Sequence, residues 1–159
     1  MVGSPIEYPQ SRDGSRQAGG EKVRDCNSRP FRDNGGMLSL GIDIGAVSAT
    51  AALLSDRDDL PPQIGVLESL RELPSGQRLW VNAYTRTQGR PVATARGILT
   101  SVRDALGEAG LTLDAIVFTG SAGKTCAAAC GGDVLNAFRA TAGGLAVLDI
   151  DAASVFEIG

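Results

Sequence analysis

Residues 38–54 read LSLGIDIGAVSATAALL, two apolar runs on either side of a short turn of small residues. The run Leu38–Ile44 has the composition of a strand, Gly45 interrupts it, and residues 48–54 resume as a returning strand. We therefore expect a β-hairpin here. Asp43 stands out because a carboxylate within an apolar strand is costly to bury unless a cation or hydrogen-bond donors satisfy it.

The chain after residue 76 alternates between strand and helix patterns. Pro91 is suited to the first turn of a helix, and apolar residues then recur every three or four positions until Gly110 provides a stop. These apolar positions are Val92, Ala95, Leu99, Val102 and Leu106. We expect further strands at residues 77–85, 113–118 and 153–158, and helices after Ser121 and over residues 134–148. The order predicts an α/β domain with a mixed sheet, in which the apolar run 113–118 is covered on both faces.

The composition is that of one globular domain, with 43% hydrophobic residues, 21% charged residues and a net charge of −3. This charge gives no basic field for nucleic acid, so we expect no such partner. The apolar runs are shorter than the ~20 residues of a spanning helix, and the N-terminus resembles no signal peptide. We therefore expect a cytoplasmic protein without membrane contact. The absence of histidine excludes Ser-His-Asp and histidine-zinc chemistry within this polypeptide, and three cysteines argue against a disulfide framework.

Residues 1–36 differ in composition from the rest of the chain. They carry six basic and five acidic residues and many Gly, Ser and Pro, without an apolar period. Such a segment buries too little apolar surface to offset its ordering entropy, so we expect a disordered leader. Met37 directly precedes the first strand, so residues 37–159 would make a self-contained start, with residues 1–36 as an upstream extension without a structural role.

The turn of the predicted hairpin supports two interpretations. In the functional one, Asp43 is directed at a magnesium ion or its waters, while the backbone N–H groups of Gly45, Ala46, Val47 and Ser48 face phosphate oxygens. Glycine permits that close approach of the backbone. In the structural one, the turn is a tight hairpin with an aspartate at its edge. The spacing alone leaves both open.

The hairpin sequence resembles the first phosphate motif of the superfamily that contains acetate kinase, sugar kinases and actin. Three further stretches, in order and at fitting distances, are similar to the BadF/BadG/BcrA/BcrD-type ATPases. They are YTRTQGRPV at residues 84–92, FTGS at 118–121 and VFEIG at 155–159. This family includes the activators of 2-hydroxyacyl-CoA dehydratases and the ATPase subunits of benzoyl-CoA reductase.

The resemblance implies a ribonuclease-H-like lobe that binds ATP or ADP with magnesium. It further implies that ATP hydrolysis drives electron transfer into a CoA-thioester dehydratase or reductase, whose subunits would be the partners. Asp43 and Glu157 would be catalytic, and the nucleotide would contact Gly45, Ala46, Val47, Ser48, Gly120, Ser121 and Gly159. Full-length relatives are commonly dimers that share an iron–sulfur cluster, and their cluster cysteines lie beyond the position of Gly159. The resemblance therefore implies a lobe truncated at the second phosphate motif, with no cluster from this chain.

The chain departs from the family pattern at several positions. Ala46 and Val47 stand where the family usually has serine or threonine, and Thr50 stands where lysine is common. Ala137 and Thr141 lie in a segment where the family carries an Asn-Glu pair and a histidine. These differences favour a first alternative, a non-catalytic, degenerate lobe that acts as an interaction domain. A second alternative is a sugar or acetate kinase-like phosphotransferase, which Glu157 disfavours because kinases prefer aspartate there.

Other features of the sequence are predicted to be structural. The stretch GSAGKT at residues 120–125 fails as a Walker A loop because Phe118 occupies the position of its first glycine. We expect a simple strand-to-helix connection there. Cys126 and Cys130, four apart, are interpreted as small buried residues rather than metal ligands. Arg86, Arg90 and Arg96 are expected to be solvated, and Trp80 and Tyr84 to pack together on one face of the sheet.

Overall fold

The computed structural model describes residues 36–155. The predicted leader, except for Gly36, lies outside these residues, and so do Glu157, Gly159 and the second half of the strand predicted at 153–158. Within the described part of the chain, no helix is long and apolar enough to cross a membrane.

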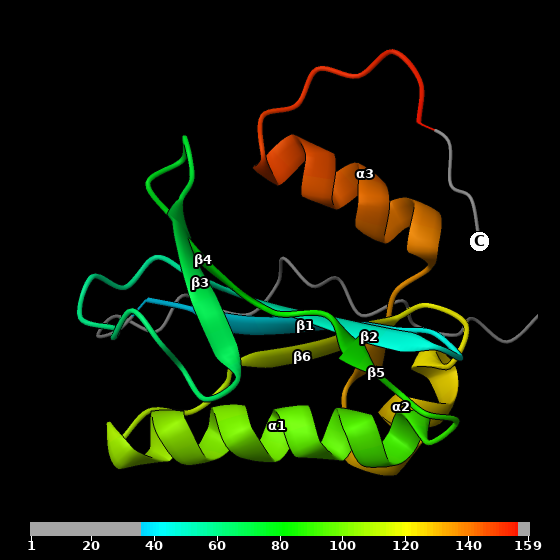
Figure 1. The fold of residues 1–159 in the computed structure, drawn as a ribbon. Helices are drawn as coiled ribbons and strands as arrows, with labels where there is room; N and C mark the ends of the chain where they lie inside the picture. Colours follow the sequence, from blue (N-terminus) through cyan, green and yellow to red (C-terminus); the bar gives the residue numbers. More distant parts are fainter. Residues whose placement is uncertain (1–35, 156–159) are drawn as a thin grey trace, which may run out of the picture. The chain divides into compact units, whose positions relative to one another are not determined.

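The described residues form an α/β fold with a seven-stranded mixed sheet, as predicted (Figure 1). The strands are β1 (Leu38–Ile44), β2 (Ser48–Ser55), β3 (Leu67–Glu72), β4 (Arg78–Asn82), β5 (Thr85–Arg86), β6 (Ala115–Thr119) and β7 (Asp133–Val134). The helices are α1 (Pro91–Glu108), α2 (Gly123–Cys130) and α3 (Ala137–Val147).

The predicted hairpin is the centre of the sheet. β1 and β2 pair antiparallel with Asp43 opposite Thr50, and β1 pairs in parallel with β6. The sheet order is β3-β4-β2-β1-β6-β7, and β5 adds a short antiparallel pairing to the start of β2. Because β1 and β6 are parallel, their carboxyl ends lie at the same edge of the sheet, next to the hairpin turn.

The core lies between one face of the sheet and the two helices α1 and α2 (Figure 1). α1 buries Ala95, Ile98, Leu99, Val102 and Leu106, which confirms most of the predicted helical stripe, and Ile98 extends it. Alternate residues of β1 complete this layer, with Leu40, Ile42 and Ile44 at most 1% exposed. Burying a side chain of this size contributes about 1.5–3 kcal/mol, so this layer is the main source of stability.

The opposite face of the sheet is less covered than the sequence predicted. Of the run expected to be buried on both faces, Phe118 is buried and Ile116 packs against the core, whereas Ala115 and Val117 on the other face are only half-buried. The prediction was wrong because a continuous apolar run is also compatible with a strand that has one partly open face. The residues on this face beside Val117 are small, since Gly41 and Ala52 lie next to it in register.

The strand predicted at residues 77–85 is broken in two. β4 ends at Asn82, whose Oδ1 accepts a hydrogen bond from the Ala51 amide at 2.6 Å and whose amide nitrogen donates to Thr85 Oγ1 at 3.1 Å. The chain turns there, so Tyr84 is 65% exposed and does not pack beside the fully buried Trp80. The prediction for Trp80 is confirmed, and the one for Tyr84 was wrong.

The C-terminal part also differs from the predicted boundaries. The helix predicted at residues 134–148 begins at Ala137, because Asn136 caps it by accepting a hydrogen bond from the Phe138 amide at 3.0 Å. Residues 133 and 134 instead pair with β6 as the short strand β7. Residues 153–155, the described part of the predicted last strand, are not in a strand. The sequence shows no clear pattern over residues 63–73, where β3 forms and pairs with β4.

Candidate phosphate-facing hairpin tip

Asp43 lies at the carboxyl end of β1, next to the hairpin turn. Its register partner on β2 is Thr50 and its partner on β6 is Thr119, so the three residues form one row across the sheet. The Asp43 side chain is exposed. The carboxyl ends of parallel strands are where open α/β sheets commonly bind ligands. The position of Asp43 therefore suits contact with a ligand or its metal ion.

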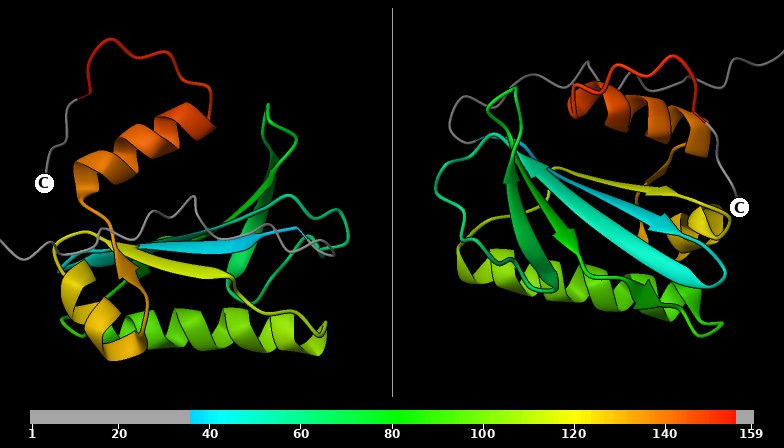
Figure 2. Two further views of the ribbon diagram at one scale, coloured as in Figure 1. Left: turned by 180° about the vertical axis from the view of Figure 1, so that it is seen from behind. Right: turned by 45° about the horizontal axis from the view of Figure 1, so that its top comes forward.

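The turn after β6 packs directly against the carboxyl end of β1 (Figure 2). Gly120 has a φ of +85°, and a Cβ at this position would overlap the Asp43 Oδ1 atom and the Ile44 carbonyl oxygen. The Ala122 amide donates to that same Ile44 oxygen at 3.0 Å. A Cβ placed on Gly45 would lie 3.9 Å from Ser121 Oγ. The stretches GIDIG and FTGS, far apart in sequence, thus meet at one place.

The segment after β5 holds the other side of the hairpin turn. Thr87, only 2% exposed, donates from its hydroxyl to the Ala46 carbonyl oxygen at 2.5 Å. Its backbone amide donates to the Val47 carbonyl oxygen at 2.8 Å. Three of the four stretches that carry the family resemblance therefore meet at the hairpin turn. The fourth, VFEIG, lies outside the described residues except for Val155.

The amides of the turn divide into two groups. Gly45 donates to the Ser48 carbonyl oxygen at 2.9 Å, so its N–H closes the hairpin and the prediction that it faces a phosphate was wrong. The Ala46 and Val47 amides make no hydrogen bond to any residue that the structure describes, and both residues are exposed. We call residues 45–48 the hairpin tip. The Ala46 and Val47 amides are thus available to an anion, and their contact with phosphate stays a prediction.

Asp43 is a single carboxylate at the tip. Among residues 36–155, no three Asp, Glu, Cys or His side chains are grouped so that they could hold a metal ion. This donor set fits magnesium, which proteins often hold through one or two carboxylates together with phosphate oxygens and water. The overlap that a Cβ at Gly120 would cause with Asp43 shows that the carboxylate needs this glycine beside it. Asp43 would hold the ion, and the ion would neutralise phosphate charge.

Thr119 is a residue of this site that the sequence analysis missed. It follows Phe118 in β6 and lies beside Asp43 in register, and its Oγ1 is buried without a hydrogen-bond partner in the described structure. A buried hydroxyl without a partner costs roughly 1–3 kcal/mol. Thr119 lies beside Asp43 only because β1 and β6 pair in this parallel register. No local sequence pattern predicts that register.

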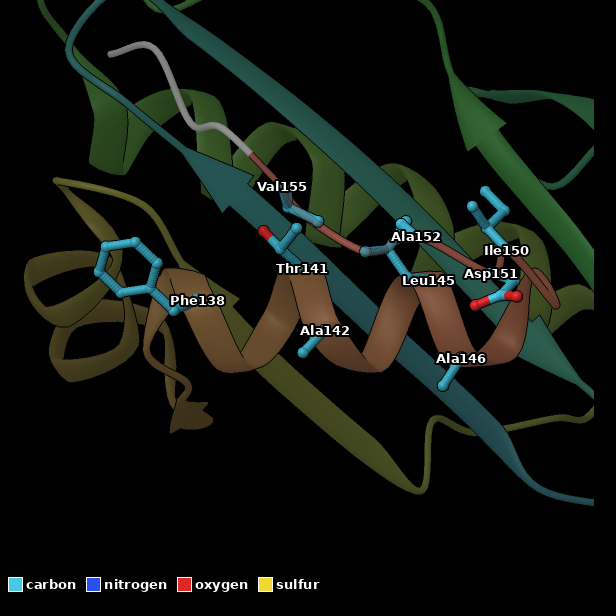
Figure 3. A pocket seen from close by; sticks show the side chains of 9 residues that line it. All are labelled: Phe138, Thr141, Ala142, Leu145, Ala146, Ile150, Asp151, Ala152 and Val155. Carbon is cyan, nitrogen blue, oxygen red and sulfur yellow. The ribbon is translucent and has the colours of Figure 1, made fainter.

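The hairpin tip is open rather than enclosed. A hollow of about 420 Å³ lies elsewhere, between α3 and residues 150–155, and is lined mainly by apolar side chains (Figure 3). The residues around it are Phe138, Thr141, Ala142, Leu145, Ala146, Ile150, Asp151, Ala152 and Val155, none of them a predicted site residue.

The structure agrees with most of the structural roles predicted for the GSAGKT stretch, the two cysteines and the arginines. The Phe118 side chain is fully buried, and residues 120–125 connect β6 to α2, which confirms the strand-to-helix connection. Cys126 is buried in the core, where burial, with a smaller contribution from Cys130, raises the pKa of its thiol. Cys130 is half-buried and packs against the same core. The predicted solvated arginines are exposed, and Arg96 also donates to the Ala129 carbonyl oxygen at 3.3 Å.

No family model matches the chain, and neither the curated proteins nor the solved structures include a significant match to it. The resemblance to the BadF/BadG/BcrA/BcrD-type ATPases consequently depends on the four quoted stretches. The structure adds that two of the other stretches, YTRTQGRPV and FTGS, each contact the hairpin at or beside its tip.

Proposed function

We propose that residues 37–159 are the N-terminal ATP-binding lobe of an activator-type ATPase with a ribonuclease-H-like fold. The observation that carries the proposal is the convergence of Asp43, two free tip amides and Gly120 at the carboxyl ends of β1 and β6. The strand order β4-β2-β1-β6-β7, with β2 antiparallel to both its neighbours and β6 parallel to β1 and β7, is also the order of a ribonuclease-H-like sheet.

In this proposal each part of the tip has a distinct role. The Ala46 and Val47 amides donate to phosphate oxygens, a task that needs no side chain. Asp43 would hold magnesium, directly or through water, and the ion would neutralise phosphate charge. Because the tip has little enclosure, the affinity of this lobe for nucleotide is expected to be low. By the resemblance, ATP hydrolysis would drive electron transfer into a CoA-thioester dehydratase or reductase.

Calorimetric titration of the full chain with ATP, with and without magnesium, tests the proposal. We expect binding that strengthens with magnesium, and an Asp43→Asn variant that loses this magnesium dependence. Asp104→Asn is the matched control, because Asp104 is an exposed carboxylate on α1, outside the hairpin tip. An ATP affinity that changes neither with magnesium nor with Asp43→Asn contradicts the proposed role of the tip.

One observation favours the first alternative, an interaction domain without catalysis. Val47 presents an apolar side chain that is 63% exposed at the point of the tip, where the family has a hydroxyl group. Exposed apolar groups of this kind are common in protein interfaces. The same titration separates the two functions, because an interaction domain binds neither ATP nor ADP under conditions in which the protein is folded.

A further inference from the structure

We propose that Thr87 is the residue that orients the hairpin tip, by holding two of its peptide groups so that their N–H groups point away from Thr87. This role rests on the proposed function, because it concerns the same anion-binding tip. Thr87 belongs to the stretch YTRTQGRPV, which carries part of the family resemblance but has no predicted role of its own.

The argument begins with the geometry of the peptide bond. In a trans peptide the C=O and the following N–H point in opposite directions. The Ala46 oxygen points toward Thr87, because it accepts the Thr87 hydroxyl at 2.5 Å. The Val47 amide, which belongs to the same peptide group, must therefore point away from Thr87. It has no acceptor among the described residues.

The next peptide group is held in the same way. The Val47 oxygen accepts the Thr87 backbone amide at 2.8 Å, so the N–H of Ser48 also points away from Thr87. One buried residue thus fixes two successive peptide groups of an exposed turn. Without it, an exposed turn rich in small residues has many alternative conformations, and each of them would have to be given up when an anion binds.

Thr87 is itself held in place by the start of α1. Its carbonyl oxygen accepts the Arg90 amide at 2.8 Å across a turn in which Gln88 and Gly89 both have positive φ, +49° and +70°. Pro91 then begins the helix. The hydroxyl, amide and carbonyl groups of Thr87 are therefore all engaged, and the tip is linked to the most regular element of the fold.

The hydroxyl and the backbone amide make separable contributions. A Thr87→Val variant keeps the shape of the side chain and the amide bond to Val47, but it loses the bond to Ala46. Thr87→Ser keeps the hydroxyl and serves as the conservative rescue. Thr94→Val is the matched control, because Thr94 Oγ1 also donates to a carbonyl oxygen, that of Arg90 at 3.1 Å, but on the exposed surface of α1.

Inorganic pyrophosphate is the probe, since it presents phosphate oxygens without a base or sugar. Loss of a single orienting hydrogen bond corresponds to roughly a tenfold weaker association. We therefore expect Thr87→Val to bind pyrophosphate about tenfold more weakly than the unchanged chain, with Thr87→Ser and Thr94→Val close to the unchanged chain. The amide chemical shift measured by NMR should change more at Val47 than at Ser48 in Thr87→Val, which a general loss of folding would not produce.

Three outcomes would overturn the role of Thr87. They are equal pyrophosphate binding by Thr87→Val and the unchanged chain, a folded Thr87→Ser that binds as poorly as Thr87→Val, and no pyrophosphate binding by the unchanged chain. If pyrophosphate binding depends on Thr87 but magnesium does not strengthen ATP binding, the proposed ATPase function is refuted and this inference is supported. Circular dichroism confirms that each variant compared is folded.

Discussion

Replacing Gly120 with alanine tests whether the turn after β6 is built around Asp43. Gly120 has a φ of +85°, in the left-handed region, which costs an alanine roughly 1–2 kcal/mol. The new Cβ would also overlap Asp43 Oδ1 and the Ile44 carbonyl oxygen, and the backbone atom cannot move away without straining the bond that Ala122 donates to it. Such overpacking costs about 1–3 kcal/mol more.

Two other glycines separate the two contributions to this cost. Gly76 has a similar φ of +79° but has nothing within 4 Å of a Cβ, so Gly76→Ala measures the backbone cost alone. Gly97 lies inside α1 with equally open space, so Gly97→Ala should stabilise the protein by about 0.5–1 kcal/mol. The predicted order of stability is Gly97→Ala, then the unchanged chain, then Gly76→Ala, then Gly120→Ala.

Urea unfolding followed by circular dichroism provides the measurement. We expect Gly120→Ala to lose about 2–5 kcal/mol of unfolding free energy and Gly76→Ala about 1–2 kcal/mol. The difference between the two variants is the cost of contact with β1. Equal losses in the two variants would refute the reasoning, because they would show that the space beside Asp43 accommodates a methyl group.

The remaining predictions concern the core and the inner hydrogen bonds. Asn82→Ala removes the acceptor of the buried Ala51 amide and should cost about 1–3 kcal/mol in urea unfolding, whereas Ser75→Ala, which breaks an exposed side-chain bond, should change little. Because burial raises the pKa of Cys126, the folded state holds its proton more tightly than the unfolded state. Stability is therefore expected to fall as pH rises above the usual thiol pKa of roughly 8.5, and Cys126→Ala should flatten that fall in urea titrations between pH 7 and pH 10. A thiol reagent should modify half-buried Cys130 in the native protein well before Cys126, and equal rates would contradict the burial of Cys126.

The elements that the sequence predicted well are those with local signals. The hairpin of β1 and β2 has two apolar runs and a glycine turn, and α1 has a proline start and an apolar stripe from Val92 to Leu106. Each pattern is complete within about twenty residues. Local propensity and burial therefore favour the same structure in both, and the observed boundaries agree with the predicted ones within a residue or two.

The elements that were missed depend on partners elsewhere in the chain. β3 lacks a regular alternation, and its pairing with β4 shifts register between Leu67 and Ser69, so no simple period describes it. β4 ends early because the Asn82 side chain bonds to Ala51, 31 residues away. An asparagine at the end of an apolar run has no local feature that identifies this distant partner.

The candidate site shows the same division. The sequence identified Asp43 and the tip, because an aspartate before a glycine turn is a local pattern. It did not assign a task to Thr87, which acts on Ala46 from 41 residues away, and it missed Thr119, which only the register of β1 and β6 brings near Asp43. The sequence therefore predicted which residues lie at the hairpin tip better than it predicted which residues hold the tip in place.

This division bears on how the unusual tip residues should be interpreted. Ala46 and Val47 lack the hydroxyl groups of the family, which by itself favours a degenerate lobe. However, Thr87 holds the Ala46 and Val47 carbonyl groups and so directs the Val47 amide, and the neighbouring carboxylate is packed against Gly120, so neither arrangement depends on a side chain at position 46 or 47. Loss of the hydroxyls removes two donors but leaves the backbone donors in place. The loss therefore weakens a phosphate site of this kind without dismantling it, and Thr87 and Gly120 are the positions at which a degenerate lobe would be expected to have changed.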